Sequence, residues 1–203
     1  MVNYVMEFGL DFLREYSDED IQELVRRNPP MRFERTADGK LLVSPPAGFA
    51  SDGVNTLLIQ RLANWNERFG NGGRVAGSSA GFRLPDTALF APDASWLSAE
   101  RFVDLRSSQS LKTFARMCPN LVFEVASHSD RLAVVRRKIE SYIRNGAACA
   151  VLIDPEDRVV EVSDGSSLHA GLRGSTLTIP VALLAGALAP FELDLNELFA
   201  AGE

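Results

Sequence analysis

Glu124 is the residue whose type and setting in this sequence point most clearly to chemistry. It lies within the apolar run of residues 121–126, which is typical of a strand covered on both faces. A carboxylate in such a strand is costly to bury and requires a cation, hydrogen-bond donors or a raised pKa. A structural ion pair with an arginine and a functional site both meet that requirement, so the position alone leaves the two interpretations open.

Asp93 and Lys138 extend this setting. Asp93 follows Pro92 at the entry of a predicted strand, where proline fixes φ and presents the next side chain in a defined orientation. Lys138 lies on the helix predicted after Glu124 and borders its buried stripe, so its ammonium can reach toward a strand edge. Taken singly, Asp93 after a proline is typical of a turn, and Lys138 is typical of a solvated basic helix face.

Together the three residues predict a site for phosphodiester hydrolysis. Two carboxylates from neighbouring strands offer oxygen ligands to a hard divalent cation, and a nearby lysine positions water or stabilises developing charge. Other chemistries have little support, because the two His and two Cys lack the spacing of a zinc site. The sequence also contains no phosphate-cradling GxxxxGK[ST] loop and no dinucleotide fingerprint.

The elements that position these residues form a strand–helix–strand unit. An apolar strand over 121–126, a helix over 131–145 and a second apolar strand over 148–153 predict a parallel pair with a right-handed crossover. Ser129 or Asp130 is suited to cap the helix, and Gly146 to close it. Residues 159–162 are expected to pair with the second strand as a hairpin.

The remaining segments predict further helices and antiparallel strands. A helix is expected over 10–28, a hairpin around Asp38-Gly39, a core helix over 51–69 and a β-meander over 74–78, 81–84 and 94–97. Residues 176–180 predict an edge strand, and the chain is expected to end in a short helix near Leu198-Phe199. The fold class is therefore α/β (α+β) with a mixed sheet.

Length and composition indicate one globular domain. The 203 residues carry a net charge of −6, yet residues 31–146 hold sixteen basic and eleven acidic groups. This uneven distribution is compatible with a basic surface that meets phosphates, and equally with an ordinary solvated surface. No apolar segment is long enough to span a bilayer, no secretory signal is evident, and two cysteines suit a reducing interior, so we expect no membrane association and a cytoplasmic location.

A succession of short motifs resembles the Uma-two family, whose members are described as endonucleases of the restriction-endonuclease-like PD-(D/E)XK superfamily. The order and spacing of the motifs carry this resemblance, which runs from about residue 30 to residue 165. The matching residues are Glu34, Asp38-Gly39-Lys40, Ser44-Pro45-Pro46, Gly81-Phe82-Arg83-Leu84-Pro85-Asp86, Ala91-Pro92-Asp93, Cys118-Pro119-Asn120, Phe123-Glu124-Val125-Ala126, Lys138, Tyr142, Gly146 and Ile153-Asp154-Pro155.

The resemblance implies a restriction-endonuclease-like mixed sheet flanked by helices, Mg²⁺-dependent hydrolysis of phosphodiester bonds, with Mn²⁺ as an alternative cation, and a homodimer. Within a single domain of residues 1–203, it places a nuclease-like core at 31–165, a helical segment at 1–30 and a strand and helix extension at 166–203. Asp93 and Glu124 match the metal-binding acids, and Glu34 matches an acidic position that contributes to the site. Lys138 matches a lysine displaced to the helix, since Ala126 stands where the superfamily's simplest pattern has lysine.

The leading hypothesis is a Mg²⁺-dependent endonuclease acting on DNA, with Asp93 and Glu124 as ligands, Lys138 as the electrostatic or water-positioning group and Glu34 as an auxiliary residue. A second hypothesis is a catalytically inactive nuclease fold that binds nucleic acid or a protein partner, which the acidic net charge favours. A third is a purely structural protein, which would be supported if these four side chains lay apart.

Overall fold

The apolar run around Glu124 forms β7 (Leu121–Val125), a fully buried strand inside a six-stranded sheet. The computed structural model describes residues 15–108, 111–128, 131–165, 168–172 and 175–203. The sheet has the order β10-β9-β8-β7-β6-β3, and only the β7–β8 pair is parallel. The other strands are β3 (Arg74–Gly77), β6 (Ala94–Leu97), β8 (Cys149–Asp154), β9 (Val159–Ser163) and β10 (Leu168–Leu172). The predicted mixed sheet is therefore confirmed.

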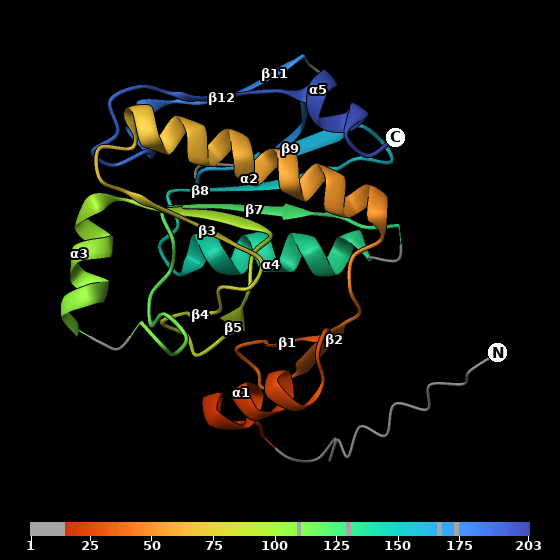
Figure 1. The fold of residues 1–203 in the computed structure, drawn as a ribbon, viewed down its shortest axis with the longest axis vertical. Helices are drawn as coiled ribbons and strands as arrows, with labels where there is room; N and C mark the ends of the chain where they lie inside the picture. The colour runs from red at the N-terminus through yellow and green to blue at the C-terminus, as the bar shows by residue number, and fades with distance from the viewer. Residues whose placement is uncertain (1–14, 109–110, 129–130, 166–167, 173–174) are drawn as a thin grey trace.

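Helices pack on both faces of this main sheet (Figure 1). α2 (Phe49–Phe69) shares a core cluster with Leu121 and Phe123 of β7, whereas α4 (Leu132–Arg144) shares another with Val122. Successive side chains of a strand point to opposite faces. Glu124, two residues after Val122, consequently faces α4.

The start of α4 differs in one detail from the sequence prediction. Arg131 is its N-cap residue, and Ser129 and Asp130, which were expected to cap it, lie outside the described residues. At the other end Gly146 has a φ of +95°, as expected for the residue that lets the chain leave the helix.

A second, four-stranded sheet has the order β2-β1-β5-β4 and comprises β1 (Arg32–Arg35), β2 (Leu41–Ser44), β4 (Phe82–Arg83) and β5 (Leu89–Phe90). The hairpin at Asp38-Gly39 is confirmed, although only Gly39 of that dipeptide has a positive φ, of +82°. The predicted β-meander is wrong, because β4 and β5 leave β3 and join the hairpin strand β1. Burial explains the departure, since Phe82 and Phe90 pack into the cluster shared with α4.

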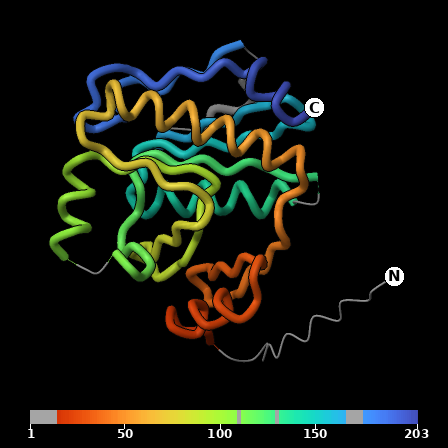
Figure 2. Tube along the Cα trace, viewed as in Figure 1, coloured from red at the N-terminus to blue at the C-terminus, as the bar shows by residue number. Residues whose placement is uncertain are grey.

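α1 (Asp18–Arg27) packs on this small sheet, below the main sheet in the view of Figure 2. The helix predicted over 10–28 begins later than expected, because Ser17 is its N-cap and forms a capping box with Asp20. Residues 10–14 of that prediction lie outside the described residues. A further helix, α3 (Ala99–Ser108), was not predicted; Leu105 is its one fully buried residue, so the sequence shows little periodicity there.

The C-terminal segment packs on α2 and lies at the opposite end of the molecule from α1 (Figure 2). Its strands β11 (Thr176–Ile179) and β12 (Phe191–Asp194) form a separate two-stranded sheet, with the short 3₁₀ turn η1 (Val181–Leu183) between them and α5 (Leu195–Ala200) after them. The predicted edge strand is confirmed as β11, whose hydrogen-bond partner is β12 in this separate sheet, and the predicted terminal helix is α5. No helix among the described residues is both long and apolar enough to cross a membrane.

Candidate active site

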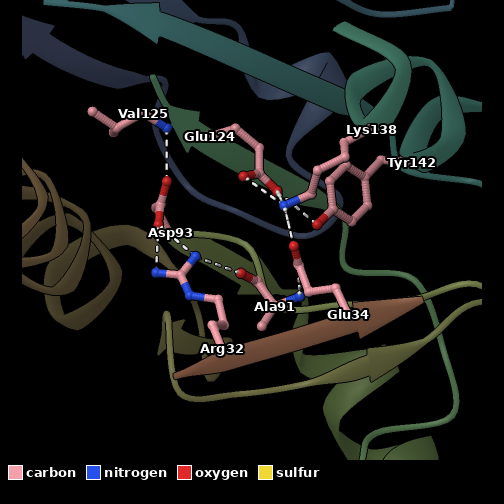
Figure 3. Close-up of polar contacts among 8 residues, drawn as sticks. All are labelled: Arg32, Glu34, Ala91, Asp93, Glu124, Val125, Lys138 and Tyr142. Carbon is pink, nitrogen blue, oxygen red and sulfur yellow. Dashed lines mark hydrogen bonds and ion pairs between the residues drawn. The ribbon is translucent and has the colours of Figure 1, made fainter. Parts of the chain in front are cut away.

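Glu124 is buried between the main sheet and α4, with 4% of its surface exposed. Its carboxylate accepts a hydrogen bond from the Tyr142 hydroxyl, at 2.8 Å from Oε1, and one from the Lys138 ammonium, at 2.9 Å from Oε2 (Figure 3). Both donors lie on the same face of α4, four residues apart. Lysine and tyrosine thus compensate the buried carboxylate, and no arginine among the described residues forms an ion pair with Glu124.

Lys138 joins Glu124 to a second acid, Glu34. The ammonium Nζ lies 3.0 and 3.1 Å from the two carboxylate oxygens of Glu34 on β1, while Oε1 of Glu34 also accepts the Ala91 backbone N–H at 2.7 Å. Glu34 and Lys138 are 104 residues apart in sequence. The contact therefore fastens the small sheet to α4.

Asp93 lies immediately before β6, beside Glu124. Ala94 is paired with Phe123 in the antiparallel register of β6 and β7, and one further step along that register brings Asp93 level with Glu124. Its Oδ2 accepts the Val125 backbone N–H at 2.8 Å, and its Oδ1 accepts two N–H groups of Arg32 at 3.1 and 3.2 Å (Figure 3). Each carboxylate oxygen of Asp93 therefore has a hydrogen-bond donor, which fixes the side-chain orientation.

The buried acids influence one another's protonation. The pKa of Glu124 is raised from 4.5 to about 7, mainly by burial; Lys138 opposes this shift, and the negative charges of Asp93 and Glu34 add to it. Burial alone would lower the pKa of Lys138, but Glu124 and Glu34 outweigh it and raise that pKa above its ordinary value. Lys138 consequently stays charged at neutral pH.

The buried acids also shift the pKa values of Tyr142 and Arg32. Burial, followed by the charges of Glu124 and Glu34, raises the pKa of Tyr142 well above 10, so the phenol keeps its proton and donates a hydrogen bond to Glu124. Burial lowers the pKa of Arg32, but Asp93 and Glu34 outweigh that effect and raise it. The site therefore holds two permanent cations against three carboxyl groups.

The donor set fits a hard divalent cation. Asp93 and Glu124 offer carboxylate oxygens from adjacent strands, and Oδ2 of Asp93 and Oε2 of Glu124 each accept one hydrogen bond, which leaves a lone pair on each of these two oxygens. Within the ranges that the structure describes, no group of three or more His, Cys, Asp or Glu side chains forms a complete metal site. A cation here would take its remaining ligands from water or from substrate phosphate, as Mg²⁺ commonly does.

The structure brings the four residues singled out in the sequence into one buried region. Lys138 contacts both Glu34 and Glu124. Asp93 is linked to them through the Val125 backbone N–H, which belongs to the residue after Glu124. This proximity removes the support for a purely structural protein that separation of the four would have given.

Sequence reasoning assigned no role to Arg32 or to the hydroxyl of Tyr142. Tyr142 was detectable, because it follows Lys138 by one helical turn on a stripe that was expected to be buried. Arg32 alternates with Glu34 on a predicted strand, which places both on one face. Its partner Asp93, 61 residues further on, is set by the pairing of β1 with β5, which the sequence does not reveal.

Other reactive side chains lie away from this region. Burial raises the pKa of the Cys118 and Cys149 thiols to about 12, so neither is a nucleophile at neutral pH. His128 is exposed and lies 3.1 Å from Glu156. The candidate active site is therefore the cluster of Arg32, Glu34, Asp93, Glu124, Lys138 and Tyr142.

Comparison with known proteins identifies relatives of this arrangement. The model of the Uma2 family, described as "Putative restriction endonuclease", matches residues 18–186. A crystal structure from Anabaena variabilis ATCC 29413, described as "a putative nuclease belonging to DUF820", is similar with a TM-score of 0.69 and 15% identity, over 90% of this chain and 98% of that chain. This likeness confirms the predicted nuclease-like α/β fold. No curated protein matches the sequence.

Proposed function

Because the chain belongs to the Uma2 family, we propose that it is a Mg²⁺-dependent endonuclease that hydrolyses phosphodiester bonds in DNA, and that Mn²⁺ can replace Mg²⁺. The observation that carries the proposal is that Asp93 and Glu124 lie side by side at adjacent strands, with the Lys138 ammonium 2.8 and 2.9 Å from the two carboxylate oxygens of Glu124. The acids and the amine are buried together, which costs desolvation free energy, and apolar residues of similar volume often stabilise a fold at least as well as a buried ion pair.

Asp93 and Glu124 are the residues that would hold the cation. When bound, Mg²⁺ polarises a phosphoryl oxygen and lowers the pKa of water. Glu124 must be ionised to take part, and its pKa near 7 makes that state accessible at neutral pH. Its orientation is fixed by Tyr142, whose hydroxyl donates to Oε1.

Lys138 acts in this proposal as a charged hydrogen-bond donor. Its raised pKa makes it a poor general base, so it stabilises negative charge that develops on the phosphoryl group, or orients a water through its N–H groups. Glu34 positions this ammonium from the opposite side, at 3.0 Å. Glu34 is accordingly a positioning residue, since its carboxylate contacts Lys138 and the Ala91 backbone.

DNA as the substrate is supported by the family description and by the excess of basic groups in residues 31–146. The homodimer and the cytoplasmic location expected from the sequence stay predictions. Sedimentation of the purified chain tests the first of these.

Cleavage of a supercoiled plasmid and of labelled single- and double-stranded oligonucleotides tests the activity. Wild type is expected to cleave DNA with Mg²⁺ or Mn²⁺ and not with EDTA, whereas Asp93→Asn and Lys138→Met lose at least about a hundredfold in rate. Glu140→Gln, on the exposed face of α4, is the matched control and should cleave like wild type.

One alternative is favoured by a specific observation. Both oxygens of Asp93 already have donors in the protein, as expected of an inactive fold that only binds nucleic acid or a protein partner. DNA binding without cleavage in either cation would support that alternative. Cleavage that survives both Asp93→Asn and Glu124→Gln would contradict the proposed active site.

A further inference from the structure

Arg32 holds Asp93 in an arrangement that is open to replacement. Its Nη1 and Nη2 both approach the single oxygen Oδ1, at 3.1 and 3.2 Å, and Nη1 lies 3.4 Å from the Ala91 carbonyl. A strong arginine–carboxylate pair instead joins two nitrogens to two oxygens. The second oxygen of Asp93 is kept by the Val125 backbone N–H, so loss of Arg32 would leave Asp93 anchored.

The two cationic side chains of the site, Arg32 and Lys138, differ in solvent exposure. The Arg32 side chain is 28% exposed, whereas that of Lys138 is 9% exposed and lies between two acids. Arg32 can therefore move into water, where its charge is solvated. Lys138 cannot leave without exposing Glu34 and Glu124 to each other in a buried region.

The formal charges of the site indicate that Arg32 is the group that a bound divalent cation would displace. Glu34, Asp93 and Glu124 face two cations, and Arg32 experiences the charge of all three acids. A divalent cation added to this set leaves a surplus of positive charge beside Arg32. Release of Arg32 to solvent brings the formal charge of the site to zero and frees Oδ1 of Asp93 at the same time.

We propose that Arg32 is a displaceable counter-cation of Asp93, which occupies this carboxylate while no divalent cation is bound and yields it when one binds. The inference rests on the proposed function, because it takes Asp93 to be a ligand of the cation. Arg32 thereby weakens cation binding and, in return, keeps the buried acids neutralised in the cation-free protein. It is a positioning residue of the site.

The test measures Mn²⁺ binding by the electron paramagnetic resonance of free Mn²⁺, without substrate. Arg32→Gln is expected to bind Mn²⁺ roughly tenfold more tightly than wild type, because the competitor is gone. Arg83→Gln is the matched control, since Arg83 is 35% exposed and pairs with Asp18 at 2.9 Å, away from the site. Its affinity should equal that of wild type.

Lost repulsion alone would also tighten binding, so a second measurement follows the guanidinium itself in the wild-type chain. With ¹⁵N-labelled arginine, the Nε–H signal of Arg32, assigned by its absence from Arg32→Gln, is expected to shift on saturation with Mg²⁺, while the Arg83 signal stays in place. An Arg32 signal that does not respond to bound Mg²⁺ would overturn the inference, whether or not the variant folds.

The outcomes separate this inference from the proposed function. If wild type binds Mn²⁺ and Arg32→Gln binds it no more tightly, the inference fails and the proposed function stands. If neither protein binds Mn²⁺, both fail. Tighter binding by Arg32→Gln than by wild type, together with an Arg32 signal that shifts on saturation with Mg²⁺, supports both.

Discussion

Glu124 illustrates how one buried side chain couples stability to function. The carboxylate is surrounded by β7, β8 and α4, and its charge is offset by Lys138 and a tyrosine hydroxyl. Because burial and the neighbouring acids outweigh Lys138 and raise its pKa to about 7, the protonated and ionised forms are both accessible near neutral pH, and the proposed cation would bind the ionised form. The residue is therefore poised between two states near neutral pH.

A first prediction concerns the pH dependence of stability without divalent cations. The pKa of Glu124 is about 7 in the folded protein and 4.5 ordinarily, so between these values the folded state keeps a proton that the unfolded chain releases. The contribution of Glu124 to stability is thus present at low pH and is lost as the pH rises through this window.

Urea unfolding at pH of about 5 and of about 7.5 measures this effect through linkage. Wild type should lose more unfolding free energy between the two conditions than Glu124→Gln. Glu140→Gln, exposed on the same helix, should retain the wild-type difference. An equal pH dependence of wild type and Glu124→Gln would show that Glu124 is ionised throughout.

A second prediction isolates the Tyr142 hydroxyl. Tyr142→Phe keeps the ring, whose centroid lies 5.5 Å from that of Phe90, and removes only the donor to Glu124. We expect a loss of about 1–3 kcal/mol in unfolding free energy, because a buried acceptor is left with fewer donors. Chemical denaturation measures it, and an unchanged value would mean that Lys138 alone satisfies the carboxylate.

At the scale of elements, local patterns predicted the elements with strong periodicity. The apolar runs of β7 and β8 and the stripe of α4 were identifiable, and so was the position of Glu124 on the side of Lys138. The two-residue strands β4 and β5 carry too little pattern to show which sheet they join. The sheet that β4 and β5 join depends on burial against residues far away in the sequence. The pairing of β5 with β1 brings Arg32 beside Asp93, so this contact could not be predicted either.

A third prediction tests how the C-terminal segment is seated on α2. A Cβ built on Gly53 would lie 2.2 Å from the backbone oxygen of Ala201, so this helical glycine makes room for the end of α5. Gly53→Ala should destabilise the protein by about 1–3 kcal/mol, although the same change in an open helix stabilises it.

Thermal or urea unfolding of Gly53→Ala measures this cost. Asn64→Ala, at an exposed position of the same helix, is the control and should be neutral or slightly stabilising, because alanine is the better helix former. A stabilised Gly53→Ala would mean that the C-terminal segment shifts away from α2 without loss.

At the scale of the whole molecule, the site lies where the two larger sheets meet. Arg32 and Glu34 come from the small sheet, whereas Glu124 belongs to the main sheet, Asp93 immediately precedes its strand β6, and Lys138 lies on the helix that covers it (Figures 1 and 3). Ion pairs across this boundary fasten the sheets in the cation-free protein. In the proposed function, binding of a cation would change those contacts and could alter how the two sheets are held together.

Anomalous diffraction from a crystal soaked in Mn²⁺ tests the central claim most directly. A peak between the carboxylates of Asp93 and Glu124, lost in Asp93→Asn crystals soaked in the same way, is the predicted result. Mn²⁺ bound only at other acidic side chains, with Asp93 still held by Arg32 at full soaking concentration, would contradict it.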